Sequence, residues 1–94
     1  MKTIILRVVS QGVVSYVPSQ KAEGGQLAKC VIRLREPGGK YGSDEFLVTL
    51  LGNLADCTFN EGDLVVASLR FQVHEVNGNY FQDITANDII KLGR

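Results

Sequence analysis

Apolar and polar residues alternate strictly along one stretch of the chain, and this pattern constrains the fold more than any other feature. From Leu64 to His74, one face carries Val65, Ala67, Leu69, Phe71 and Val73, whereas the other carries Ser68, Arg70, Gln72 and His74. A period of two is that of a β-strand with one buried face. Asn77-Gly78 follows, a pair that tolerates the positive φ required at both central positions of a type I′ turn. We therefore predict a strand near 63–76 that turns and pairs with a strand near 79–86.

The same period of two recurs in the first half of the chain and predicts three further strands. The first, near 3–17, contains Gly12, which predicts a bulge or a sharp bend within a long strand. The second, near 28–35, alternates cleanly, with Ile32 and Leu34 on one side and Arg33 and Arg35 on the other. The third, near 44–51, is apolar on both sides.

These segments add up to five strands with one odd connection. Residues 52–62, between the third and fourth strands, have room for a short helix or an irregular link, and residues 87–94 are expected to form a short tail. This arrangement predicts an all-β, five-stranded Greek-key barrel of the OB-fold type, forming a single domain over residues 1–94. A bent first strand suits such a barrel because it must serve both halves of the closed sheet. An SH3-like barrel and a small sandwich are the alternatives.

The charge balance limits the kind of ligand that the chain can bind. Ten Lys and Arg residues balance ten Asp and Glu residues, so the net charge is zero. Strong non-specific binding to nucleic acid depends mainly on phosphate neutralisation, and this composition argues against it. A local basic face is still compatible with a neutral chain, because steering depends on how the charges are distributed.

The sequence predicts neither catalysis nor a metal site. His74 has no partner at the spacing of a nucleophile–base motif, and Asp83 and Asp88 suit solvated or capping roles, so we expect no enzymatic activity and no cofactor. Cys30 and Cys57 form no CxxC pair and have no histidine cluster near them, which argues against zinc.

The cysteines and the apolar runs also predict where the protein is found. We expect both cysteines to be buried free thiols of a cytoplasmic protein. No apolar run approaches the ~20 residues of a membrane span, so no membrane association is expected. Arg7 interrupts the first apolar stretch too early for a signal-peptide core.

Several segments resemble the bacterial single-stranded DNA-binding proteins. Residues 46–55, Phe-Leu-Val-Thr-Leu-Leu-Gly-Asn-Leu-Ala, resemble the third strand and following turn of that family. Residues 61–66 are similar to the start of its fourth strand, and residues 77–81, with Ile84 and Ala86, to its final hairpin. Short OB proteins related to those binders share the same pieces, joined by a segment that resembles residues 36–41. The similarity covers about residues 28–92 and implies an OB-fold that binds single-stranded DNA, although this chain has no Trp.

The resemblance and the fold together suggest a set of binding residues. An OB barrel binds its ligand across its second and third strands, between two flanking loops. Outward cations there would meet phosphates, and aromatic side chains would stack on bases. The candidates are Lys21, Lys29, Arg33, Arg35, Lys40, Tyr41, Arg70, Tyr80 and Phe81, whereas Phe46, Phe59 and Phe71 are expected in the core. The alternative for the cations is a solvated face with charge pairs to Glu45 or Glu75, and for the aromatics it is packing or an oligomer interface.

Two functions are compatible with these features. The first is a non-catalytic module that binds single-stranded DNA, or RNA, with little sequence preference. The second is an OB-fold interaction or oligomerisation module that binds no nucleic acid. In either case we expect a homo-oligomer, a dimer or a tetramer, because the strand near 44–51 is apolar on both faces and one face needs a cover.

Overall fold

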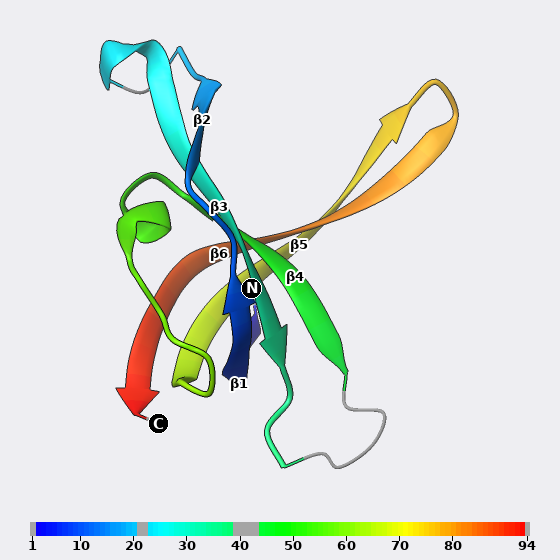
Figure 1. Ribbon diagram of the computed structural model, residues 1–94. Coiled ribbons are helices and arrows are strands. Elements are labelled where there is room, and N and C mark those ends of the chain that lie inside the picture. Colours follow the sequence, from blue (N-terminus) through cyan, green and yellow to red (C-terminus); the bar gives the residue numbers. More distant parts are fainter. Residues whose placement is uncertain (1, 21–22, 39–43, 94) are drawn as a thin grey trace.

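The computed structural model describes residues 2–20, 23–38 and 44–93 and is almost entirely β-structure (Figure 1). The strands are β1 (Lys2–Gln11), β2 (Ser15–Pro18), β3 (Gln26–Arg35), β4 (Glu45–Leu51), β5 (Leu64–Val76) and β6 (Asn79–Gly93). Two short 3₁₀ helices accompany them, η1 (Glu23–Gly25) and η2 (Gly52–Asp56). The predicted short connection between the third and fourth long strands is confirmed, because η2 lies between β4 and β5.

The six strands form one sheet that closes on itself. Their order is β1-β5-β6-β4-β3-β2, and an additional β1–β3 pairing closes the sheet into a barrel. All neighbouring strands are antiparallel except β4 and β6, which pair in parallel through Thr49 and Thr85. β1 and β2 together correspond to the single first strand predicted near 3–17, so the structure agrees with the five-strand prediction.

The core lies inside the barrel and follows the predicted alternation. β1, β3, β4 and the first half of β5 direct every second residue into it, as a period of two requires. The fully buried side chains with the largest volumes include Leu6, Ile32, Leu34, Leu50, Leu69, Val8, Val48 and Val65. Ala55 of η2 and Phe59 are also buried, and Phe46 is partly buried against the core, so two of the three phenylalanines predicted in the core lie there.

The first strand breaks at the predicted glycine. β1 ends at Gln11 and β2 begins at Ser15, while the Gly12 N–H donates to the Val31 carbonyl oxygen over 2.8 Å. A Cβ atom at Gly12 would lie 3.1 Å from that same oxygen, which explains why a residue without a side chain occupies this point of close approach. The bulge in the β1–β3 ladder itself lies between Val8 and Ser10.

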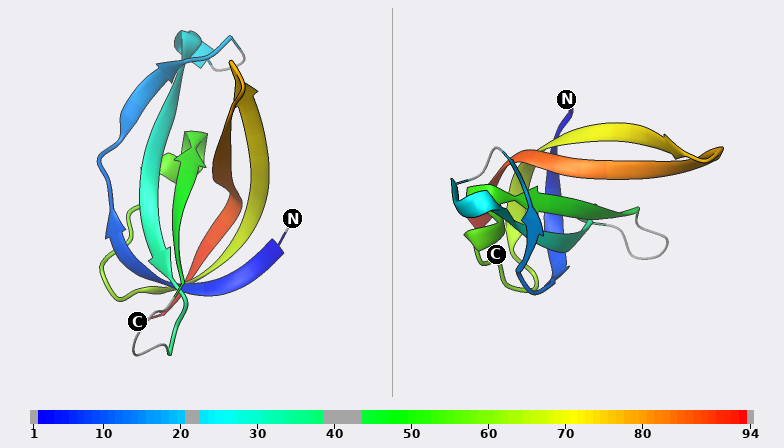
Figure 2. Two further views of the ribbon diagram at one scale, coloured as in Figure 1. Left: turned by 90° about the vertical axis from the view of Figure 1, so that its right-hand side faces the viewer. Right: turned by 90° about the horizontal axis from the view of Figure 1, so that it is seen from above.

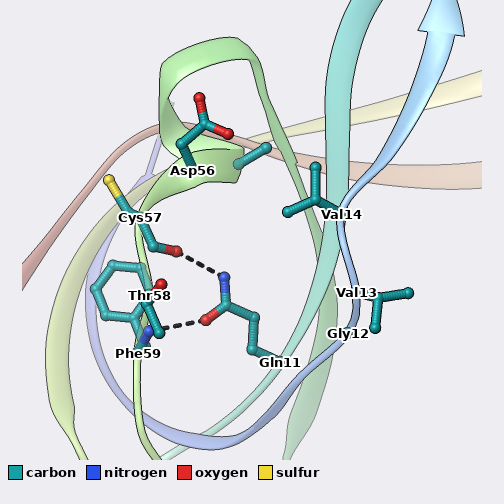
Figure 3. A pocket seen from close by; sticks show the side chains of 9 residues that line it. Gln11, Gly12, Val13, Val14, Asp56, Cys57, Thr58 and Phe59 are labelled. Atoms are coloured by element: carbon teal, nitrogen blue, oxygen red, sulfur yellow. Dashed lines mark hydrogen bonds between the residues drawn. The ribbon is translucent and has the colours of Figure 1, made fainter.

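The Gln11 side chain joins the break in the first strand to the segment after η2 (Figure 3). Its Nε2 donates to the Cys57 carbonyl over 2.7 Å, and its Oε1 accepts from the Phe59 N–H over 2.8 Å. A peptide group in a parallel strand bonds its neighbour in the same pattern. The side-chain amide of Gln11 therefore makes the two hydrogen bonds that a residue of a neighbouring parallel strand would make. A pocket of about 420 Å³ lies beside it, between residues 12–14 and 55–59.

Only one of the two cysteines is buried. Cys30 lies in the core, and its Sγ lies 3.1 Å from the Gly12 carbonyl oxygen. Cys57 is exposed, so the prediction that both thiols are buried is wrong for this residue. It follows η2 directly, in an extended segment whose neighbours on both sides, Asp56 and Thr58, are also exposed.

β5 and β6 form a hairpin whose distal half projects away from the barrel (Figures 1 and 2). Its turn is the predicted one, with positive φ at both Asn77 (51°) and Gly78 (82°). Phe71 was predicted to lie in the core, but 39% of its surface is exposed. The β1–β5 ladder covers β5 only up to Leu69, so the alternating apolar face continues beyond the part of the strand that other strands cover.

β6 runs to Gly93, so the prediction of a tail over residues 87–94 is wrong. The ladder with β5 shifts register between Ser68 and Leu69, which leaves Asn87 without an opposite residue and breaks the period of two at that point. Asp88 lies within the strand rather than in a turn, and its Oδ1 accepts from the Ile89 N–H over 2.9 Å. Near the strand end, Lys91 Nζ lies 3.6 Å from the buried Asp63.

Candidate nucleic-acid interface

The outer face of β3 and β4 carries three of the predicted cations. Their neighbours Cys30, Ile32 and Leu34 are buried, so alternation directs Lys29, Arg33 and Arg35 outward. The ladder places each of them beside an outward residue of β4: Lys29 pairs with Leu51, Arg33 with Leu47, and Arg35 with Glu45. Arg33 and Arg35 are exposed, whereas Lys29 is half-buried.

The fourth cation, Arg70, is joined to this face by a row of paired residues. Val31 lies opposite Thr49, Thr49 pairs with Thr85 across the parallel ladder, and Thr85 lies opposite Arg70. Paired residues in a sheet direct their side chains to the same face. The row Val31–Thr49–Thr85–Arg70 therefore crosses four strands on the outer surface, and the exposed Arg70 lies at its end.

One of these cations is already neutralised within the chain. The Arg33 guanidinium donates through Nε and Nη2 to the same oxygen of Glu45, over 2.7 and 2.6 Å, and both side chains are partly exposed. From the sequence, a charge pair with Glu45 was the alternative to phosphate binding by these cations. Within the described residues no carboxylate makes a salt bridge to Arg35.

The two adjacent aromatics of the hairpin point to opposite faces. Phe81 pairs with His74 and shares the face of Arg70, whereas Tyr80 pairs with Glu75 and shares the face of Phe71 and Ile84. Both are well exposed, 53% for Phe81 and 71% for Tyr80. On the Arg70 face, His74 Nε2 lies 2.7 Å from Asp83 Oδ2, so a carboxylate accompanies Phe81 there.

Three of the predicted site residues, Lys21, Lys40 and Tyr41, lie outside the described residues, and the structure gives no position for them. The structure places Lys29, Arg33, Arg35, Arg70 and Phe81 on one continuous face and Tyr80 on the other side of the hairpin.

Sequence reasoning assigned the apolar component of this face to an oligomer interface rather than to the binding site. Leu47 is 66% exposed and Val31 is 40% exposed, and both lie among the cations. A hollow of about 360 Å³ beside them is lined by Arg33, Glu45, Phe46 and Leu47. The signal was present in the sequence, because an apolar residue at the outward position of a half-buried strand departs from the alternation. An apolar surface of this kind can contact the face of a base.

A comparison with solved structures identifies the fold. The second OB-fold domain of replication protein A from Methanococcus maripaludis, solved by solution NMR, is similar over 98% of this chain and 83% of that domain, with a TM-score of 0.69 and 18% sequence identity. The predicted OB-fold is therefore confirmed, whereas the resemblance to the bacterial binders in particular stays a prediction. No family model and no curated protein matches the sequence.

Two further observations on residues 2–20, 23–38 and 44–93 bear on function. They contain no group of three or more His, Cys, Asp or Glu side chains arranged to hold a metal ion. No helix among them is long and apolar enough to cross a membrane.

Proposed function

We propose that this OB-fold domain binds single-stranded nucleic acid, primarily DNA, across the outer face of β3, β4 and the β5–β6 hairpin. The observation that supports this proposal most is the paired row from Val31 to Arg70, because it places Arg70 of β5 on the same surface as the cations of β3. The fold neighbour comes from a replication protein, which agrees with the proposal. The proposed role is binding, without catalysis and without a cofactor.

The residues divide into two kinds of contact. Arg35, Arg70 and Lys29 carry charge that phosphates can neutralise, and Arg33 contributes less because Glu45 already pairs with it. Phe81 offers the stacking surface on this face, and Leu47 offers apolar contact. Because these contacts read the backbone and the base faces rather than base edges, little sequence preference is expected.

Titration of a fluorescent oligo(dT) at two salt concentrations tests the proposal. We expect modest affinity that falls with salt, by roughly 0.7 log units per log unit of salt for each phosphate neutralised. A parallel titration with a single-stranded RNA oligomer measures the preference for DNA over RNA. A titration with duplex DNA measures the preference for single strands. Absence of binding at low salt would contradict the proposal and leave the interaction module as the function.

Replacing Glu45 by glutamine is expected to raise the affinity for oligo(dT), by roughly two- to tenfold, because it frees Arg33 and removes a negative charge from the face. The matched control is Glu61→Gln, which makes the same change at an exposed residue of the turn before β5. Equal affinities of Glu45→Gln and the wild type at low salt would show that the ligand does not cross this part of β4.

A further inference from the structure

A second surface lies on the outer face of β1, β5 and β6 and is aliphatic. The ladders place Ile5 opposite Val66 and Val66 opposite Ile90, which forms one row across three strands. Leu64 and Leu92 lie one step further along β5 and β6 on the same side, where the ladder shifts register between Leu64 and Val65. We call the set Ile5, Leu64, Val66, Ile90 and Leu92 the aliphatic face.

The exposure of the aliphatic face is high for such side chains. Ile5, Ile90 and Leu92 are 49%, 52% and 53% exposed, and none of the five members is charged. The aliphatic face adjoins the proposed nucleic-acid surface, because Arg7 pairs with Arg35 across β1 and β3 and Arg70 follows Ser68 by two residues on β5. Its central row, Ile5–Val66–Ile90, contains no residue of that surface. Contiguous exposed apolar surface is one of the features that can mark a protein interaction site.

Residues of opposite charge, Arg7 and Asp88, lie at the border of the aliphatic face. Three rows of outward residues can be followed across β1, β5 and β6: Thr3–Ser68–Asp88, then Ile5–Val66–Ile90, then Arg7–Leu64 with Leu92 beside them. Arg7 and Asp88 therefore occupy diagonally opposite corners of a three-by-three grid. The Arg7 side chain is held at its corner by a 2.7 Å hydrogen bond from Nη1 to the Gly62 carbonyl oxygen.

A two-fold axis along the other diagonal of the grid, from Thr3 to Leu92, brings the two charged corners of the two copies together, with Ser68 of one copy facing Ile5 of the other. Arg7 of each copy then faces Asp88 of the other, so both charge pairs form at once. Val66 faces Val66 and Leu92 faces Leu92 of the second copy, and Ile90 faces Leu64. The strands of the two sheets cross steeply, which is one of the two common ways in which sheets pack face to face.

We propose that the aliphatic face binds a second copy of this chain, with reciprocal pairs between Arg7 and Asp88. The zero net charge of the chain favours this occupant, because two copies do not repel each other at long range. The proposal differs from the sequence-based expectation, which placed the oligomer interface on β4. It does not depend on nucleic-acid binding.

The size of the grid sets the expected strength. Strands ~4.8 Å apart and residues ~3.4 Å apart give a patch of roughly 300 Å², including side chains. Stable interfaces bury about 800 Å² on each partner. The dimer should therefore be reversible and depend on protein concentration, with a dissociation constant of micromolar order or weaker.

Mixing two charge-reversed variants tests the pairing directly. By sedimentation equilibrium, we expect Arg7→Asp alone and Asp88→Arg alone to associate at least tenfold more weakly than the wild type. An equimolar mixture of the two should recover association, because each variant supplies the charge that the other has reversed. Recovery in the mixture alone supports the proposed geometry, whereas a mixture no stronger than either variant overturns it.

A second pair of variants keeps the test independent of Arg7, which also contacts Gly62. Ile90→Lys should abolish association, and Leu47→Lys, a similarly exposed aliphatic residue on β4, should leave it unchanged. The reverse result would place the interface on β4 and overturn the proposal. A wild type that sediments as a 10.3 kDa particle up to about 1 mM would overturn it as well.

Discussion

Replacing Arg33 and Arg35 together by glutamate is expected to abolish binding to oligo(dT) and to leave the fold intact. Both side chains are exposed on β3, and their buried neighbours Ile32 and Leu34 hold the strand in place. The double change converts two cations into anions beside Glu45. With roughly 1–2 kcal/mol lost at each reversed charge, affinity should fall by roughly 30- to 1,000-fold.

Two measurements accompany this variant. Thermal unfolding should stay close to that of the wild type, because an exposed ion pair contributes only about 0–1 kcal/mol. Lys2→Glu, at an exposed position of β1 away from this face, changes the net charge by half as much as the double variant and should weaken binding only slightly. If the double variant binds oligo(dT) as well as the wild type does, the proposed site is wrong.

Replacing Gln11 by leucine should produce a large loss of stability without changing any charge. The side chain makes two hydrogen bonds to the segment after η2, and leucine can make neither (Figure 3). Leaving a buried donor or acceptor unpaired costs about 1–3 kcal/mol. Because the Cys57 bond is exposed to water and the Phe59 bond is partly buried, we expect a total of about 2 kcal/mol.

Thermal unfolding measures this effect. A loss of about 2 kcal/mol corresponds to a fall in Tm of roughly 8–16 °C for a domain of this size. Gln11→Glu separates the two bonds, because a carboxylate can still accept from the Phe59 N–H but cannot donate to the Cys57 carbonyl. Its Tm should therefore lie between those of the wild type and the leucine variant, and a leucine variant as stable as the wild type would contradict this role for Gln11.

The period of two predicted most of the barrel because each face of a strand has one environment. Ile32 and Leu34 are buried and Arg33 and Arg35 are exposed, as their alternation indicated. The turn at Asn77-Gly78 was also predictable, since positive φ at two successive residues is a local requirement that few residue pairs meet.

The errors arose where the outcome depended on the surrounding strands. Phe71 continues the alternation of Leu69, but local pattern does not reveal that β1 stops covering β5 between them. The end of β6 was missed because the extra residue Asn87 shifts the alternation, so that Ile89 is buried out of phase with the residues before it. A bulge of this kind is fixed by the partner strand rather than by the sequence of β6.

The same limit applies to the candidate site. The outward direction of Arg33, Arg35 and Arg70 followed from alternation, and the pair with Glu45 was foreseen as an alternative. The row that joins Arg70 to β3 was not foreseen, because it passes through the parallel pairing of Thr49 with Thr85, two residues far apart in the chain. Parallel contacts of this kind leave no periodic trace in a sequence.

That single parallel pairing is also the weakest closure of the barrel. β3 pairs with β4 and β5 pairs with β6 along long ladders, whereas β4 and β6 share a single residue pair, Thr49 with Thr85. Opening the barrel at this seam breaks the fewest backbone bonds, so we expect the two halves to separate transiently here before the core unfolds. A single-stranded nucleic acid bound along the row from Val31 to Arg70 would contact both β4 and β6. Its binding would then lower the population of molecules in which these two strands have separated.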